Sequence, residues 1–204
     1  MSLLRTPEEG RELAARATSF TVPDLFRRSV RVHRQRTAVV SSEVELTYAE
    51  LGDRVNRLAS VLADAGLSRG DRVAVLSTTR PEYIEVYFAA AALGLTVVGL
   101  NIRMGLDELV HCVELGRASA LFASPALAEL AEPLQHRVAA LEHIWWFPDR
   151  VGERASEYEQ LLRAASADPR PDVAEPEDIH CVLFTSGTTG RPKGAMIRDR
   201  KSVV

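Results

Sequence analysis

One short stretch near the end of the 204-residue sequence gathers most of the side chains that could do chemistry. It reads Phe184-Thr-Ser-Gly-Thr-Thr-Gly-Arg-Pro-Lys-Gly194 and continues an apolar run, Ile179–Thr185, that has the pattern of a buried strand. Glycines let a backbone approach a ligand closely, and free N–H groups, hydroxyl donors and a lysine together suit a polyphosphate. The stretch therefore predicts a phosphate-binding loop after a strand; the plainer alternative is a Gly/Thr/Ser-rich surface turn.

Two well-known nucleotide-binding loops do not fit this stretch. A Walker A loop needs Gly-Lys followed by Ser or Thr at the start of a helix, whereas Pro192 precedes Lys193 here and Gly194 follows it. A dinucleotide-binding fingerprint has a different glycine spacing and follows the first strand of its domain, and this loop comes late. Neither a P-loop NTPase nor a Rossmann dinucleotide-binding domain is therefore predicted.

The elements that must position the loop have the pattern of a layered α/β fold. Apolar segments start at Val73, Thr96, Ala120 and His143, roughly 23 residues apart, which leaves room for a strand and a crossover helix in each interval. Continuous apolar strands are expected where a parallel sheet is covered on both faces. We therefore predict a mostly parallel sheet with crossover helices, in which Trp145 and Trp146 point to opposite faces.

The region before this series has the clearest local signals. Thr47-Tyr-Ala-Glu50 has the form of a capping box and Gly66 suits the residue after the last helical turn, so a helix is expected between them. Upstream, Ala38–Val40 and Val44–Leu46 flank a polar turn and indicate a hairpin. Downstream, the Pro-rich segment 164–178 reads as an exposed connector that leads into the strand Ile179–Thr185.

Composition and charge exclude several classes of protein. With 25 Lys and Arg against 28 Asp and Glu, the net charge of -3 gives no overall attraction to nucleic acid. The longest uncharged run, Val86–Ile102, falls short of the ~20 residues of a membrane-spanning helix and reads as a buried helix followed by a buried strand. Cys112 and Cys181 are far apart and no signal-peptide core follows Met1, which favours a cytoplasmic protein.

Two other features are explained by structure alone and need no functional site. The basic run Arg27–Arg36 lies on a segment whose residues Val22, Leu25, Phe26 and Val30 share one helical face, so the arginines are expected on the solvated side rather than on nucleic acid. The histidines show no spacing typical of zinc ligands. Neither feature predicts a second site.

The loop and its surroundings resemble the adenylate-forming, or AMP-binding, superfamily. The stretch 184–194 matches the signature [YF]-T-S-G-[ST]-T-G-x-P-K-G, Leu46–Leu51 resembles an early LTYxEL segment, and Asn101-Ile-Arg103 resembles a later one. The amino-acid sequence of Leu100–Arg103 and Glu108-Leu109 is more similar to that of fatty-acyl-CoA synthetases than to that of amino-acid adenylation domains.

The resemblance implies a ligase that uses ATP, Mg²⁺ and coenzyme A to convert a carboxylic acid, foremost a fatty acid, into an acyl-adenylate and then an acyl-CoA. By position it assigns to the phosphates Thr185, Ser186, Gly187, Thr188, Thr189, Gly190 and Lys193. Thr185 is also a candidate Mg²⁺ contact. The partners are small molecules, with contact to a membrane surface left open.

The resemblance also sets expectations for domain organisation. Residues 1–196 correspond to the N-terminal portion of the AMP-binding domain, and the C-terminal domain of the family has no counterpart. Residues 197–204 do not follow the family pattern and are expected to be a non-native tail. We further expect Ile179–Thr185 to be an edge strand without a partner on its outer side. The alternatives to a ligase are a non-catalytic nucleotide-binding fragment and an interaction domain.

Overall fold

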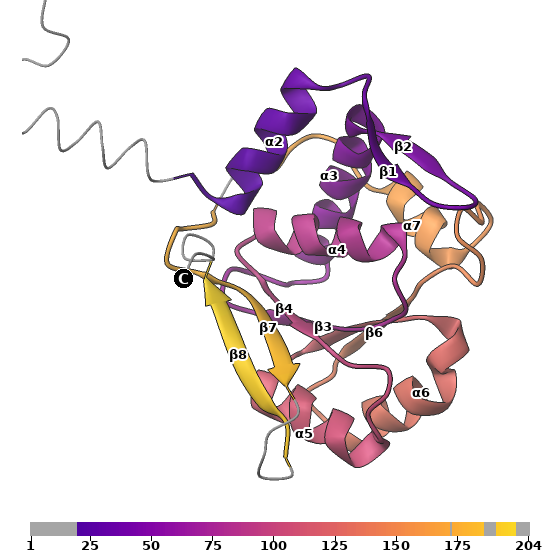
Figure 1. Cartoon of the computed structure of the whole chain (residues 1–204), viewed down its shortest axis with the longest axis vertical. Helices are drawn as coiled ribbons and strands as arrows, with labels where there is room; N and C mark the ends of the chain where they lie inside the picture. The colour runs from indigo at the N-terminus through magenta and orange to yellow at the C-terminus, as the bar shows by residue number, and fades with distance from the viewer. Residues whose placement is uncertain (1–19, 172, 186–190, 199–204) are drawn as a thin grey trace, which may run out of the picture.

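A central sheet between two layers of helices organises the chain (Figure 1). The computed structural model describes residues 20–171, 173–185 and 191–198. Within them a six-stranded sheet has the order β6-β5-β3-β4-β7-β8. Its strands are β3 (Arg72–Leu76), β4 (Thr96–Gly99), β5 (Ala120–Ala123), β6 (His143–Trp146), β7 (Ile179–Thr185) and β8 (Lys193–Arg198). The strands β3 to β7 run parallel and β8 runs antiparallel to β7, so the predicted mostly parallel α/β fold is confirmed.

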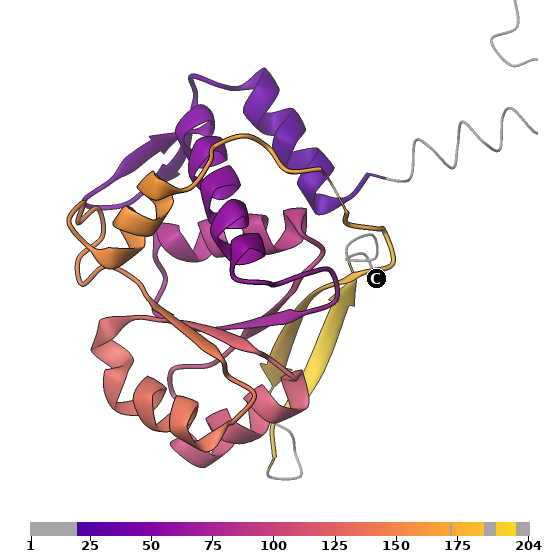
Figure 2. The same cartoon turned by 180° about the vertical axis from the view of Figure 1, so that it is seen from behind.

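Crossover helices connect the parallel strands on both faces of the sheet. They are α4 (Pro81–Ala92), α5 (Leu106–Gly116), α6 (Ala128–Arg137), which follows the short helix η1 (Pro125–Leu127), and α7 (Glu157–Ala164). Helices α5 and α6 lie on one side of the sheet and α4 and α7 on the other, as the two opposite views show (Figures 1 and 2). The chain thus winds in both directions from β3, the pattern of a doubly wound sheet.

The N-terminal elements add to the α4 side. They are α2 (Val22–Val32), the antiparallel pair β1 (Thr37–Val40) and β2 (Glu45–Thr47), and α3 (Tyr48–Asp64). The predicted capping box is present: the Glu50 carboxylate accepts hydrogen bonds from the Thr47 N–H and hydroxyl, both at 2.8 Å. These bonds hold the pKa of Glu50 below its usual value. Gly66 has φ +90°, which a glycine adopts without strain.

Two apolar clusters fill the space on either side of the sheet. The larger one joins α2, α3, α4 and α7 to one face, and the other joins α5 and α6 to the opposite face. Trp145 stacks on Phe122 in the first cluster and Trp146 packs against the second, as the alternation along β6 predicts. The core is therefore one sheet packed on both faces.

Two expectations need correction. Strand β7 is not an unpaired edge, because β8 pairs with it and is itself the edge; Ile197 and Arg198 belong to β8. Leu25 does not face the core: it is 52% exposed, while Phe26 on the neighbouring side is buried. The buried helix and strand predicted within Val86–Ile102 are present as part of α4, which begins at Pro81, and as β4. In the described part of the chain, no helix has the length and apolarity to cross a bilayer.

Candidate functional site: the β7–β8 hairpin

The phosphate-loop stretch contains the end of β7 and the start of β8, which pair antiparallel. Thr185, the last residue of β7, is paired with Lys193, the first residue of β8. Both are exposed, so the hydroxyl and the ammonium are available to a ligand. Residues Ser186, Gly187, Thr188, Thr189 and Gly190 of the predicted site lie outside the described residues. The structure thus fixes the two ends of the loop and brings Thr185 and Lys193 together.

Gly194 has a packing role that the motif alone does not reveal. It is paired with Phe184, and a Cβ at Gly194 would lie 2.9 Å from Cγ1 of Val182 and 3.3 Å from the Phe184 ring. Phe184 packs in turn against the α5–α6 cluster. The last glycine of the motif therefore leaves room for side chains that anchor the hairpin to the sheet.

The loop's second half rests beside α5. Pro192 is buried, and together with Arg191 it lines a cleft of about 370 Å³ whose other wall is one side of α5. That wall presents Asp107, Glu108, Val110, His111 and Glu114. The proline fixes φ just before Lys193, so it helps to define where the lysine leaves the loop.

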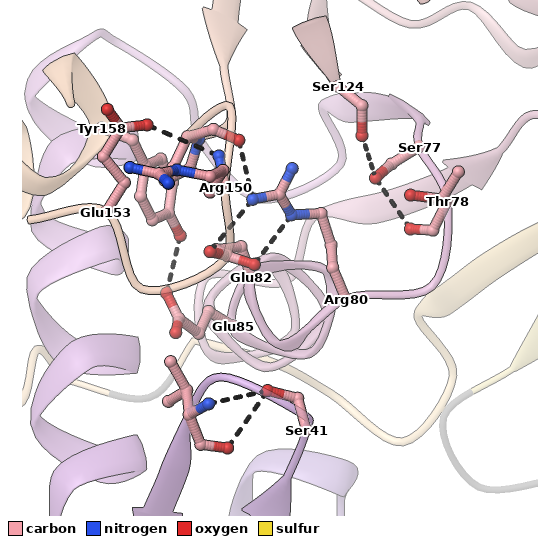
Figure 3. Close-up of polar contacts among 12 residues, drawn as sticks. Ser41, Ser77, Thr78, Arg80, Glu82, Glu85, Ser124, Arg150, Glu153 and Tyr158 are labelled. Atoms are coloured by element: carbon pink, nitrogen blue, oxygen red, sulfur yellow. Dashed lines mark hydrogen bonds and ion pairs between the residues drawn. The ribbon is translucent and has the colours of Figure 1, made fainter. Parts of the chain in front are cut away.

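The hairpin opens at the carboxyl edge of the parallel strands. Ser77 and Ser124, which follow β3 and β5, share a hydrogen bond of 2.6 Å between their hydroxyl oxygens (Figure 3). Asn101 follows β4, and its side-chain oxygen accepts a hydrogen bond from the Arg103 N–H at 3.0 Å. Ligands of doubly wound sheets bind at this edge, so the hairpin lies on the side of the sheet where a nucleotide is expected.

A buried ionic network lies behind this edge. The Arg80 guanidinium donates to the Glu82 carboxylate at 2.8 Å (Figure 3) and to the Pro148 carbonyl at 2.8 Å. It also lies 5.2 Å from the centre of the Phe147 ring. Nearby, Glu85 accepts from Tyr158 at 2.8 Å. Burial raises the pKa of Glu85 even though the charge of Arg54 opposes this.

The same network joins three helices. Arg54 of α3 donates to Glu85 of α4 at 2.6 Å and to Glu159 of α7 at 3.0 Å. Glu85 and Glu159 are thereby both paired with Arg54, so the network holds the layer together. Sequence reasoning missed it, although Glu82 and Glu85 are spaced i, i+3 on the side of α4 that also carries Val86 and Ala89. Acidic residues on a buried helical face are the signal that could have found it.

The donor set fits a phosphate better than a metal ion. Phosphates accept hydrogen bonds from hydroxyls and pair with ammonium groups, and Thr185 and Lys193 supply both. Mg²⁺ prefers oxygen ligands, of which Thr185 offers one hydroxyl. No group of three or more His, Cys, Asp or Glu side chains suited to a metal gathers among the residues that the structure places.

Comparison with known proteins decides the family. The family described as "AMP-binding enzyme" matches residues 26–204. The chain belongs to this AMP-binding enzyme family. The resemblance of the phosphate-loop stretch to adenylate-forming enzymes is thus confirmed for the chain as a whole.

Members of the AMP-binding family with known activities are similar to much of the chain. Feruloyl-CoA synthases of Amycolatopsis sp and Streptomyces sp are each 42% identical over 171 residues, which cover 83% of this chain and 32% of the relative. A long-chain-fatty-acid–CoA ligase of Thermus thermophilus is 32% identical over 181 residues, covering 88% and 32%. The chain thus spans about a third of the length of these curated relatives.

The fold also matches a solved AMP-binding enzyme. The anthranilate CoA ligase AuaEII, crystallised with anthranoyl-AMP, superimposes with a TM-score of 0.82 at 23% identity, covering 90% of this chain and 35% of that one. At this identity the match supports the fold alone.

Proposed function

We propose that this chain supplies the phosphate-binding hairpin of an AMP-forming acyl-CoA ligase. The observation that carries the proposal is the pairing of Thr185 with Lys193 at the mouth of the signature loop, where hydroxyl and ammonium are both exposed. The family membership supports the same reaction class. In this proposal Ser186, Gly187, Thr188, Thr189 and Gly190 complete the phosphate contacts.

The proposed reaction has two steps. In the first, an oxygen of the substrate carboxylate attacks the α-phosphorus of ATP; the bond from that phosphorus to the bridging oxygen breaks, and pyrophosphate leaves with the electron pair. In the second, the sulfur of coenzyme A attacks the acyl carbon, AMP leaves, and the thiol proton passes to solvent. A carboxylate is a poor electrophile, and the mixed anhydride makes its carbon reactive.

The hairpin acts in the first step. Negative charge grows on the departing pyrophosphate, and groups fixed toward that charge lower the barrier. We propose that Lys193 neutralises this charge and that Thr185 donates a hydrogen bond to a phosphate oxygen. When bound, Mg²⁺ supplies further charge neutralisation. We propose that the Thr185 hydroxyl contacts the ion.

Two acids are candidates for the substrate. The amino-acid sequence of Leu100–Arg103 and Glu108-Leu109 resembles that of fatty-acyl-CoA ligases, which favours a fatty acid. The higher identity to feruloyl-CoA synthases, 42% against 32% for the fatty-acid ligase of Thermus thermophilus, favours a hydroxycinnamic acid. We propose the aromatic acid as the second candidate on this observation.

The test is to identify the products for a panel of acids. The whole protein is incubated with ATP, Mg²⁺, coenzyme A and either fatty acids of graded length or hydroxycinnamic acids. AMP, pyrophosphate and one acyl-CoA series are expected. Formation of ADP and phosphate would refute the AMP-forming reaction. Nucleotide binding without any turnover would support the alternative, a non-catalytic nucleotide-binding or interaction fragment.

We propose a cytoplasmic location for the enzyme. Cys112 and Cys181 are both buried free thiols. Burial raises the pKa of Cys112 to about 11, so it stays a thiol at neutral pH. Free cysteines are typical of reducing compartments, where ATP and coenzyme A are also available.

A further inference from the structure

The outward face of α2 combines arginines with exposed apolar side chains. Leu25 is 52% exposed and Val32 is 60% exposed, and they lie two turns apart on the same side of the helix. Arg28 lies on this side between them, and Arg31 lies beside it; both are exposed. The sequence pattern assigned Leu25 to the core, so this mixed surface becomes visible only in the structure.

The positive charge of this face is not neutralised nearby. Arg34 and Arg36 continue it in the turn after α2 and are exposed as well. Within the described ranges, no ion pair involves these two residues, Arg28 or Arg31. The acidic residue of α2, Asp24, pairs instead with Arg27 at 3.5 Å. Four arginines therefore project from one short segment of a protein whose overall charge is -3.

The opposite side of α2 is firmly held. Phe26 stacks on Phe88 of α4 with ring centres 4.1 Å apart. Val30 packs over Gly52 of α3 so closely that a Cβ there would lie 2.8 Å from Val30 Cγ1. The helix cannot rotate to bury Leu25 and Val32 without losing these contacts. Its basic and apolar outer face is thus a fixed feature of the fold at the outside of the helical layer (Figure 1).

We propose that this face docks the protein on an anionic membrane surface. Arginines in such a segment pair with lipid phosphates, while Leu25 and Val32 enter the boundary between headgroups and acyl chains. Nucleic acid would satisfy the arginines but would give no role to the two exposed apolar side chains. The charge and the apolar positions together therefore favour a lipid surface.

The first test measures sedimentation of the 204-residue chain with vesicles. Binding is expected to vesicles of phosphatidylcholine with roughly 30% phosphatidylglycerol, whose surface carries a negative potential. No binding is expected to vesicles of phosphatidylcholine alone. Arg28→Gln/Arg31→Gln should lower the partition coefficient on the order of 25-fold. The matched control Arg103→Gln/Arg150→Gln removes two exposed arginines elsewhere and should bind as the native chain does. Equal binding by both double variants would overturn the proposal.

The second test does not depend on charge-changing variants. Because Cys112 and Cys181 are buried, an environment-sensitive thiol dye can be directed to Val32→Cys, with Arg150→Cys as the control position. A blue shift on adding the anionic vesicles is expected for the dye at position 32 only. No shift at position 32, or an equal shift at both positions, would contradict insertion of this face.

A third test distinguishes lipid from nucleic acid. Leu25→Ser/Val32→Ser should weaken binding to the anionic vesicles but leave binding to duplex DNA unchanged. Tighter binding of the native chain to DNA than to vesicles would identify nucleic acid, rather than lipid, as the partner.

Discussion

Thr185 and Lys193 are cross-strand partners at the open end of the β7–β8 hairpin. The ladder that continues from this pair toward Ile179 and Arg198 holds both backbones, so the ends of the phosphate loop are fixed by the sheet itself. The hydroxyl of Thr185 and the ammonium of Lys193 are thus held close together before a ligand binds. The pair therefore links the fold to the proposed chemistry.

Gly194→Val should destabilise the hairpin. Its new side chain would start 2.9 Å from Val182 and meet the Phe184 ring, so the anchoring contact must shift. We expect a loss of about 1–3 kcal/mol in the free energy of unfolding, measured by urea denaturation. Ala195→Val, at the neighbouring exposed position, is the control and should change stability little. Equal effects of both substitutions would remove the packing role of Gly194.

Arg54→Met should be strongly destabilising. It leaves Glu85, whose side chain is 1% exposed, without its cation, and breaking a buried pair in this way costs about 3–5 kcal/mol. The loss should shrink as pH falls, because Glu85 can then be buried as the neutral acid. Arg137→Met removes an exposed pair with Asp107 and should cost less than ~1 kcal/mol. Chemical denaturation at pH 7.5 and 5.5 separates the two cases; a loss independent of pH would contradict the role of Glu85.

His180 should make the fold sensitive to acid. It lies at an irregularity of β7, its ring meets Tyr87 edge-on at 4.2 Å, and its Nε2 has no hydrogen-bond partner among the placed residues. Burial lowers its pKa to about 4, against 6.5 without such burial. The contribution of neutral His180 to the free energy of unfolding is therefore complete above pH 6.5. It is lost as pH falls toward 4, because the unfolded chain takes up the proton at a higher pH than the folded chain does.

The size of this effect can be isolated with a variant. Between pH 7.5 and 4.5 the native chain should lose roughly 2–3 kcal/mol more stability than His180→Phe, which keeps the aromatic contact and cannot be protonated. The exposed His136→Gln should behave as the native chain does. Parallel pH dependence of the native chain and His180→Phe in urea denaturation would show that His180 is not the titrating group.

The sequence was informative where local signals and the buried pattern agreed. The bounds of the strand Ile179–Thr185 match β7, the Thr47 capping box begins α3, and the hairpin before it is present. Each of these rests on nearby residues or on a continuous apolar run. The mostly parallel sheet followed from their regular recurrence.

The missed features depend on distant contacts. Strand β8 is exposed along most of its length, so it has no apolar pattern, and only pairing with β7 defines it. The exposure of Leu25 depends on how α2 rotates against α3 and α4. The network around Arg54 joins α3, α4 and α7, far apart in the sequence. The motif predicts a phosphate-binding role for the loop, whereas the pairing that positions Lys193 required the fold.

The 204-residue chain alone should not form acyl-adenylate or acyl-CoA. In our proposal the hairpin supplies one wall for the phosphates, and the chain corresponds to about a third of the length of its curated relatives. A reaction that depends on aligned groups loses most of its acceleration when the other walls are missing. Incubation with ATP, coenzyme A and a panel of acids should yield no product above background. Turnover of about 1 per second or faster, ordinary for an enzyme, would disprove this prediction.

The most direct test of the central claim compares Lys193→Ala and Arg150→Ala in acid-dependent exchange of labelled pyrophosphate into ATP by the whole protein. If Lys193 neutralises the departing pyrophosphate, its loss should raise the activation free energy of exchange by about 2–4 kcal/mol. Exchange would then be roughly 30- to 1,000-fold slower, with little change in the apparent affinity for the acid. Thr188→Val should have an effect in the same direction. Arg150→Ala, which removes an exposed cation outside the hairpin, should exchange at the native rate. Native exchange rates in Lys193→Ala would contradict the assignment of this hairpin to phosphate chemistry.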